Sequence, residues 1–89
     1  MEVGNIVRSL AGHDSDRFYV VVKTEEGFAW IADGKRRTLE KPKRKNVRHL
    51  QMTTQRALPQ DLQTNKKIRH LLWTLNYGTP QPVTEMEEA

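Results

Sequence analysis

The chain has 89 residues, of which 36% are hydrophobic and 29% charged, with a net charge of +4 and no cysteine. This length predicts one small domain with little room for a deep catalytic cleft, and the lack of cysteine excludes disulfide frameworks, thiolate metal sites and a cysteine nucleophile. Because no apolar run approaches the ~20 residues of a membrane helix and no signal peptide is recognised, we expect a cytoplasmic protein without membrane contact.

Two β-prone segments come first. Val3–Leu10 is a short run that stops at a cluster of turn-forming residues, and Phe18–Lys23 is a strong strand signal because nearly all of it is aromatic or β-branched. Alternation along the second segment divides its apolar side chains between two faces, with Phe18, Val20 and Val22 on one and Tyr19 and Val21 on the other. We expect one face to fill a small barrel and the other to be covered by another part of the chain.

A hairpin is predicted in the middle of the chain. Phe28–Ala32 is a third strand, and the Asp33-Gly34 pair that follows it is a strong signal for a two-residue turn. Such turns need positive φ angles, which Asp and Gly tolerate. Arg36–Leu39 would then be the return strand of this hairpin.

This fourth strand is expected to end before Pro42, which lacks the N–H donor that regular pairing needs. Lys41–Asn46 is therefore predicted to be a basic loop, and Val47–Met52 a fifth strand. Five short strands joined by tight turns predict a mainly β fold in which residues 1–55 form a small five-stranded barrel.

A short helix is predicted near the C-terminus. Its apolar residues follow the i, i+3, i+4, i+7 spacing of one helix face, and they are Ile68, Leu71, Leu72 and Leu75. We expect a helix from about Asn65 to about Leu75, with Thr64 or Asn65 as the N-cap. A helix this short is unstable alone in water, so its leucine stripe should pack on the spare apolar face of Phe18–Val22. Residues 56–77 are thus a connector and a C-terminal helix.

The charged residues are unevenly distributed. Residues 34–50, called the basic segment below, carry eight Lys and Arg against Glu40 alone, whereas residues 78–89 form an acidic tail that we expect to be flexible. So many bases in one segment concentrate positive potential in one place, as a polyanionic partner requires. The alternative interpretation of the basic segment is a solvated surface that keeps the protein soluble.

These segments resemble a known family. Gly4–Val7 and Gly12, followed by Tyr19–Val22, look like a KOW motif, which consists of two strands joined by a glycine-containing loop. Ala32–Lys35, together with Leu39–Leu50, is similar to bacterial KOW-domain RNA-binding proteins related to archaeal and eukaryotic large-subunit ribosomal proteins.

The resemblance covers about residues 3–52 and continues more weakly through Thr64–Leu72. It implies an SH3-like barrel, ribosomal or other structured RNA as the ligand, and no catalysis. Many KOW motifs have a glycine near the position of Ser15-Asp16, where this chain has none. The loop between the first two strands can therefore differ in shape from that of the family.

The basic segment supplies most of the candidate RNA-binding residues, because phosphates attract Lys and Arg and release counterions on binding. Neighbouring residues of the last strand and the first loop would extend it. The full set is Lys35, Arg36, Arg37, Lys41, Lys43, Arg44, Lys45, Arg48, His49, Arg8 and Arg17. We expect a monomeric, non-catalytic RNA-binding protein associated with the ribosome or translation, without cofactor or metal. The alternative is an SH3-like protein-interaction module that docks an acidic partner of the transcription or translation machinery.

Four aromatic residues could stack on RNA bases. For Tyr19, Phe28 and Trp30 we favour core positions, because so small a core needs its large apolar side chains. Trp73 could stack on a base beside two cations of the helix, or it could make a cation–π contact with Arg69 or pack against the tail. The three histidines have no metal-ligand spacing, and we expect them to be structural or surface residues.

Overall fold

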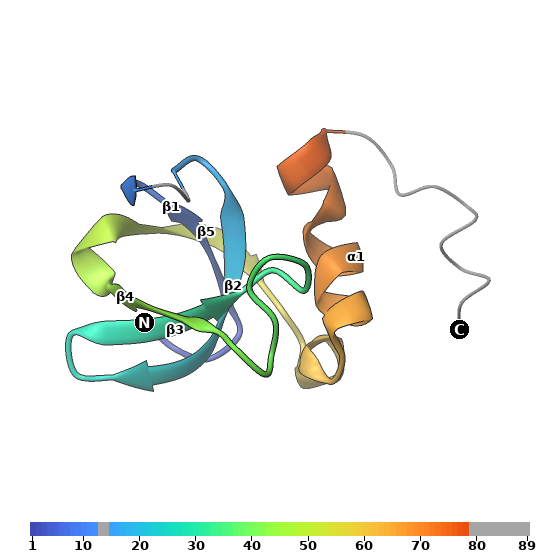
Figure 1. Ribbon diagram of the computed structural model, residues 1–89, viewed down its shortest axis with the longest axis horizontal. Helices are drawn as coiled ribbons and strands as arrows, with labels where there is room; N and C mark the ends of the chain where they lie inside the picture. Colours follow the sequence, from blue (N-terminus) through green and yellow to red (C-terminus); the bar gives the residue numbers. More distant parts are fainter. Residues whose placement is uncertain (13–14, 79–89) are drawn as a thin grey trace.

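The computed structural model describes residues 1–12 and 15–78, so His13 and nearly all of the predicted acidic tail, residues 79–89, lie outside the described residues. Within the described part, five strands precede one α-helix (Figure 1). In chain order the elements are β1 (Asn5–Ser9), β2 (Phe18–Glu25), β3 (Phe28–Ala32), β4 (Lys43–Asn46), the 3-10 turn η2 (Val47–His49), β5 (Leu50–Arg56), the 3-10 turn η3 (Pro59–Leu62) and α1 (Asn65–Tyr77).

The strands form one antiparallel sheet in the order β4-β3-β2-β1-β5. Strands β1 to β4 lie side by side in sequence order, and β5 returns to pair with the free side of β1. The predicted mainly β fold, with five strands and a C-terminal helix, is confirmed. However, β4 and β5 are the two edges of the sheet, and the described strands leave them unpaired with each other, so the sheet is not closed into a barrel.

The sheet has an apolar core on each of its two faces, as the alternation along β2 predicts. The core of the inner face consists of Val7, Tyr19, Val21, Ala29, Ile31 and Leu50. On the outer face the sheet packs against α1, through Ile6, Val20, Ala32, Ala57, Ile68 and Leu72. The helix therefore covers the face of β2 expected from the sequence, and burial of its apolar stripe supplies the stability that a short helix lacks on its own.

Helix α1 has a capping interaction at each end. The Thr64 side chain accepts a hydrogen bond from Lys67 N at 3.1 Å, so Thr64 is the N-cap. The helix continues past the predicted end at Leu75 to Tyr77. It stops at Gly78, whose φ of 71° is the left-handed conformation that favours glycine. None of the helices in the described residues is long and apolar enough to cross a membrane.

The predicted two-residue hairpin at Asp33-Gly34 is wrong. One oxygen of the Asp33 carboxylate accepts hydrogen bonds at 2.9 Å from three consecutive backbone N–H groups, those of Lys35, Arg36 and Arg37. These bonds hold the chain in a compact turn. A return strand over Arg36–Leu39 would need some of the same N–H groups for its ladder, and no strand forms there.

The fourth strand lies further along the chain. Lys43–Asn46 forms β4 and pairs with β3, so the predicted basic loop over Lys41–Asn46 is wrong for its last four residues. Pro42 precedes this strand, where its missing N–H costs no ladder bond. The predicted strand over Val47–Met52 starts too early, because its first three residues form η2 and pairing begins only at Leu50.

Candidate nucleic-acid interface

Strand β4 divides the cations of the basic segment between the two faces of the sheet. Residues directly opposite each other in an antiparallel pair point to the same face. Lys43 and Lys45 lie opposite core residues of the inner face, whereas Arg44 lies opposite Trp30 on the outer face. Lys45 is 8% exposed, and its Nζ donates a hydrogen bond to Ala11 O at 2.8 Å. Three cations that a loop would have presented together therefore lie on different surfaces.

The outer face of β3 carries two aromatic side chains that belong to neither core. Phe28 and Trp30 are half-buried, whereas Tyr19 is fully buried, so of these three only Tyr19 has the predicted core position. The guanidinium carbon of Arg44 lies 3.6 Å from the centre of the Phe28 ring and 5.8 Å from that of Trp30. The Nζ of Lys23 lies 4.7 Å from the Trp30 ring centre. Lys23, Phe28, Trp30 and Arg44 are called the aromatic–cation face below.

Lys23 was not among the predicted RNA-binding residues, and its position depends on a bulge in β2. The pairing of β2 with β3 shifts register between Val21 and Lys23, which places Lys23 opposite Trp30. Strict alternation would have put Lys23 on the inner face with Tyr19 and Val21. The one signal in the sequence is a lysine directly after three valines, at a position that regular pairing would bury.

Helix α1 leaves the aromatic–cation face uncovered. The helix packs where Val20 and Ala32 lie, while the β2–β3 hairpin extends away from it (Figure 1). Lys23 and Arg44 are both exposed. The two rings thus lie beneath a layer of exposed cations, an arrangement that can offer positive charge and a flat apolar surface to the same ligand.

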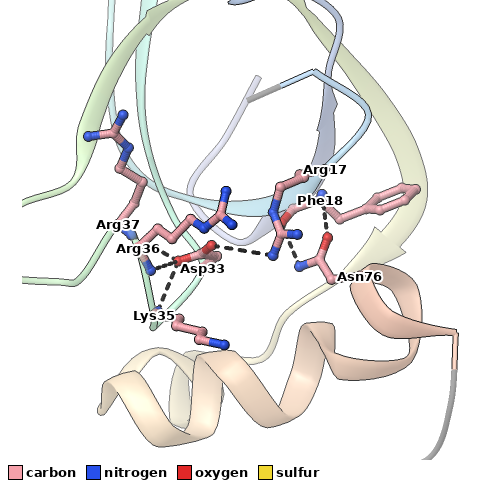
Figure 2. Close-up of polar contacts among 7 residues, drawn as sticks. All are labelled: Arg17, Phe18, Asp33, Lys35, Arg36, Arg37 and Asn76. Carbon is pink, nitrogen blue, oxygen red and sulfur yellow. Dashed lines mark hydrogen bonds and ion pairs between the residues drawn. The ribbon is translucent and has the colours of Figure 1, made fainter. Parts of the chain in front are cut away.

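The loop between β3 and β4 carries three more exposed cations of the basic segment, Lys35, Arg36 and Lys41, while Arg37 is half-buried. The Asp33 turn directs their side chains differently. Lys35 extends along α1, whereas Arg37 points away from the helix (Figure 2). The loop therefore presents positive charge on more than one side.

Two contacts hold this loop against α1. The backbone at Gly34, with a φ of 80°, lies so close to the helix that a Cβ there would collide with the Asn65 carbonyl oxygen and lie 2.9 Å from Arg69 N. The Asn65 side-chain amide accepts a hydrogen bond from Leu39 N and donates one to Glu40 Oε1, each at 2.8 Å. The bond from Asn65 is the main reason why the pKa of Glu40 lies below its ordinary value. The loop is thus held by the helix at both of its ends.

The remaining candidates lie beside the sheet edge. Arg48 and His49 are exposed in η2, which follows β4 directly. The Asn46 side chain accepts a hydrogen bond from Arg48 N at 2.9 Å, and Asn46 itself lies opposite Phe28. This turn is therefore close in the chain to the aromatic–cation face and can extend it.

The two candidates from the first loop have acidic neighbours within the protein. Arg8 forms an ion pair with Asp16, and both side chains are well exposed. The Arg17 Nη2 lies 4.0 Å from Oδ2 of the buried Asp33. The structure thus places Arg17 near the helix, which leaves the aromatic–cation face uncovered.

A hollow between η3 and α1 is lined by Gln60, Asp61, Thr64, Lys66, Lys67, His70 and Leu71. In residues 1–12 and 15–78, no three His, Cys, Asp or Glu side chains gather in a way that could hold a metal ion. Trp73 packs against Tyr77, with 4.4 Å between ring centres, and its buried indole N–H has no hydrogen-bond partner.

Comparison with known proteins adds no identification. No protein-family model matches the chain, and no curated protein matches it. The likeness to KOW domains therefore stays a prediction that rests on the residues quoted above.

Proposed function

We propose that the protein binds RNA without catalysing a reaction, and that the aromatic–cation face is its main contact surface. The observation that carries this proposal is the pair of outward rings, Phe28 and Trp30, that lie under exposed cations. In a domain this small, large aromatic side chains are normally needed in the core. Two such rings outside both cores suit a surface that stacks bases and binds phosphates together.

The rings and the cations have different roles in this proposal. Stacking on an aromatic side chain contributes about 1–3 kcal/mol per base and tolerates any base, because every base has a π-face. Lys23, Arg44 and the exposed cations of the β3–β4 loop neutralise phosphates and release counterions. Contact with the Phe28 ring also holds the Arg44 guanidinium over the sheet before RNA arrives, which lowers the entropy lost on binding.

The class of RNA follows from the resemblance to KOW domains and from the shape of the surface. A sheet face flanked by loops suits irregular RNA, in which bases are splayed out and shape is recognised. We therefore propose that the ligand is a structured RNA of the ribosome or the translation machinery. We expect the protein to act in the cytoplasm as a monomer.

The proposal is tested by fluorescence anisotropy with a labelled single-stranded RNA at several salt concentrations. With about five phosphates contacted, log affinity should fall with log salt at a slope of about −3.5. Removing two cations, by Lys23→Gln with Arg44→Gln, should make the slope shallower by about 1.4. The matched control is Arg56→Gln, which removes an exposed arginine that pairs with Glu2 on the opposite edge of the sheet and should leave the slope unchanged.

A slope near zero would refute the electrostatic part of the proposal. Binding of cellular partners before and after nuclease treatment separates RNA from an acidic protein partner. Partners that remain after nuclease treatment, together with no affinity for purified RNA, would show that the same cations serve a protein-interaction module instead.

A further inference from the structure

The start of β2 lies against the last turn of α1 (Figure 2). The turn after β3 lies against the first turns of the helix, and its Lys35 side chain extends along α1 toward the same place. Asn76 joins the helix to β2, because its amide accepts a hydrogen bond from Phe18 N at 2.7 Å and donates one to Phe18 O at 3.1 Å. Asp33 is 3% exposed and is held by the three backbone N–H groups of its turn. These bonds set the positions of Arg17, which lies next to Phe18, and of Lys35.

Arg17 and Lys35 converge on Tyr77. The Arg17 guanidinium carbon lies 5.6 Å from the centre of the Tyr77 ring, and the Lys35 Nζ lies 5.5 Å from it. Burial raises the pKa of the Tyr77 phenol, but hydrogen bonds and charge from the two cations outweigh it, so the pKa lies below its ordinary value. Tyr77 itself is 36% exposed, so a ligand can reach the ring from solvent.

The charges at this place are not balanced. Two cations face one phenol, and the carboxylate oxygen Asp33 Oδ2 is 4.0 Å from Arg17 Nη2. Like charges held close together repel each other, and an anion bound between them offsets this repulsion. Arg17, Lys35, Asp33 and Tyr77 together therefore carry a net charge of +1.

Buried polar atoms without partners gather here as well. They are Arg17 Nε, Asp33 Oδ2 and Trp73 Nε1, and the Trp73 ring packs on that of Tyr77. A buried polar atom that lacks a hydrogen bond lowers stability, so native proteins hold few of them. Departures of this kind are expected where a protein binds a ligand.

We propose that Arg17, Lys35 and Tyr77 bind a nucleoside phosphate, with the phosphate between the two cations and the base on the exposed ring of Tyr77. Charge-assisted hydrogen bonds from Arg and Lys are the usual contacts of phosphate oxygens, and a tyrosine ring is a usual stacking surface for a base. This inference rests on the proposed function, because a nucleotide is chosen as the ligand on the grounds that the protein binds RNA. The ligand would then be one nucleotide of a bound RNA. A free mononucleotide offers the same chemistry.

The two tryptophans report separately on the two surfaces. Trp30 belongs to the aromatic–cation face and Trp73 packs on Tyr77, and the chain has no other tryptophan. Their indole N–H signals in a ¹H–¹⁵N NMR spectrum are assigned with the variant Trp30→Phe, which keeps only the signal of Trp73. The wild-type protein is then titrated in turn with AMP, inorganic phosphate and a short oligoadenylate RNA.

We expect AMP to shift the Trp73 signal saturably, with a midpoint about tenfold higher in Lys35→Met, because Lys35 contacts the phosphate. The matched control Lys67→Met removes an exposed lysine whose Nζ bonds to Gln63, and should leave the midpoint unchanged. Tyr77→Ala should abolish the advantage of AMP over inorganic phosphate. Because Lys35 is exposed, its variant should keep the native spectrum, whereas Arg17→Met could disturb the buried Asp33 and is not needed for the test.

The outcomes distinguish this site from the proposed function. If AMP and the RNA shift only the Trp30 signal, the site at Tyr77 is refuted while the aromatic–cation face stands. If the RNA leaves Trp30 unshifted while AMP shifts Trp73, the proposed function fails and this site stands. An equal midpoint for AMP and inorganic phosphate would refute base stacking on Tyr77.

Discussion

Because the β3–β4 loop lies against α1, we predict that adding a single methyl group at Gly34 lowers the stability of the protein by a large amount. In Gly34→Ala the new Cβ must adopt a φ of 80° and meets the backbone of the helix at Asn65 and Arg69. The left-handed conformation costs an L-residue about 1–2 kcal/mol. Pressing an extra carbon into packed backbone costs about 1–3 kcal/mol more. The expected loss in the free energy of unfolding is therefore about 2–5 kcal/mol, a large part of the stability of a small domain.

Gly27→Ala is the matched control for this substitution. Gly27 has nearly the same φ, 79°, but an added Cβ would meet nothing within 4 Å. Its loss should be limited to the conformational cost of about 1–2 kcal/mol. Urea unfolding followed by tryptophan fluorescence measures both values, and thermal unfolding should show Gly34→Ala melting at least ~10 °C below the wild type. Equal losses for the two variants would show that the loop does not press on the helix.

The remaining predictions concern single side chains. Trp30→Ala should weaken RNA binding by about 5- to 160-fold without changing the salt slope, because stacking releases no counterions; a changed slope in anisotropy titrations would contradict this. Lys45→Met should leave the salt slope unchanged but lower stability in urea by about 1–3 kcal/mol, since the Ala11 carbonyl loses its partner; a shallower slope would mean that Lys45 contacts RNA. In ultraviolet titration, the pKa of the Tyr77 phenol should lie below the ordinary tyrosine value and should rise in Lys35→Met. Because the folded pKa is the lower one, ionised Tyr77 adds stability above the ordinary tyrosine pKa, and this stability is lost as pH falls through the folded pKa. A Tyr77 pKa that is unchanged in Lys35→Met would show that Lys35 does not contact the phenol.

The parts of the fold that could be predicted from the sequence depend on residues close together in the chain. Alternation along β2 and the spacing of the α1 leucines are local patterns, and they correctly indicated which faces meet. The Thr64 cap lies next to the helix it begins. Each of these features is set by a few neighbouring residues, so the periodicity of the sequence contains it.

The errors came from one local side-chain interaction and from contacts between distant residues. Asp33-Gly34 has the composition of a tight hairpin turn, but Asp33 captures three N–H groups and Gly34 meets Asn65 of the helix. Nothing near Gly34 in the chain reveals that second contact. The bulge that turns Lys23 outward likewise depends on how β2 pairs with β3. For these reasons Arg44 could be recognised from the sequence as a candidate cation, whereas Lys23 and the faces on which the cations lie could not.

The distribution of the cations over different faces of the sheet changes which residues should be tested as RNA contacts. If positive charge alone marked the interface, neighbouring Lys43, Arg44 and Lys45 would be equivalent, because they lie together in the most basic part of the chain. The strand gives them different surroundings: Lys45 bonds to a backbone carbonyl, whereas Arg44 lies over two aromatic rings. A phosphate must compete with the Ala11 carbonyl for Lys45. It can bind Arg44 while the guanidinium keeps its cation–π contact with the Phe28 ring. RNA affinity should therefore follow the cations that lie on rings more closely than the total charge of the segment.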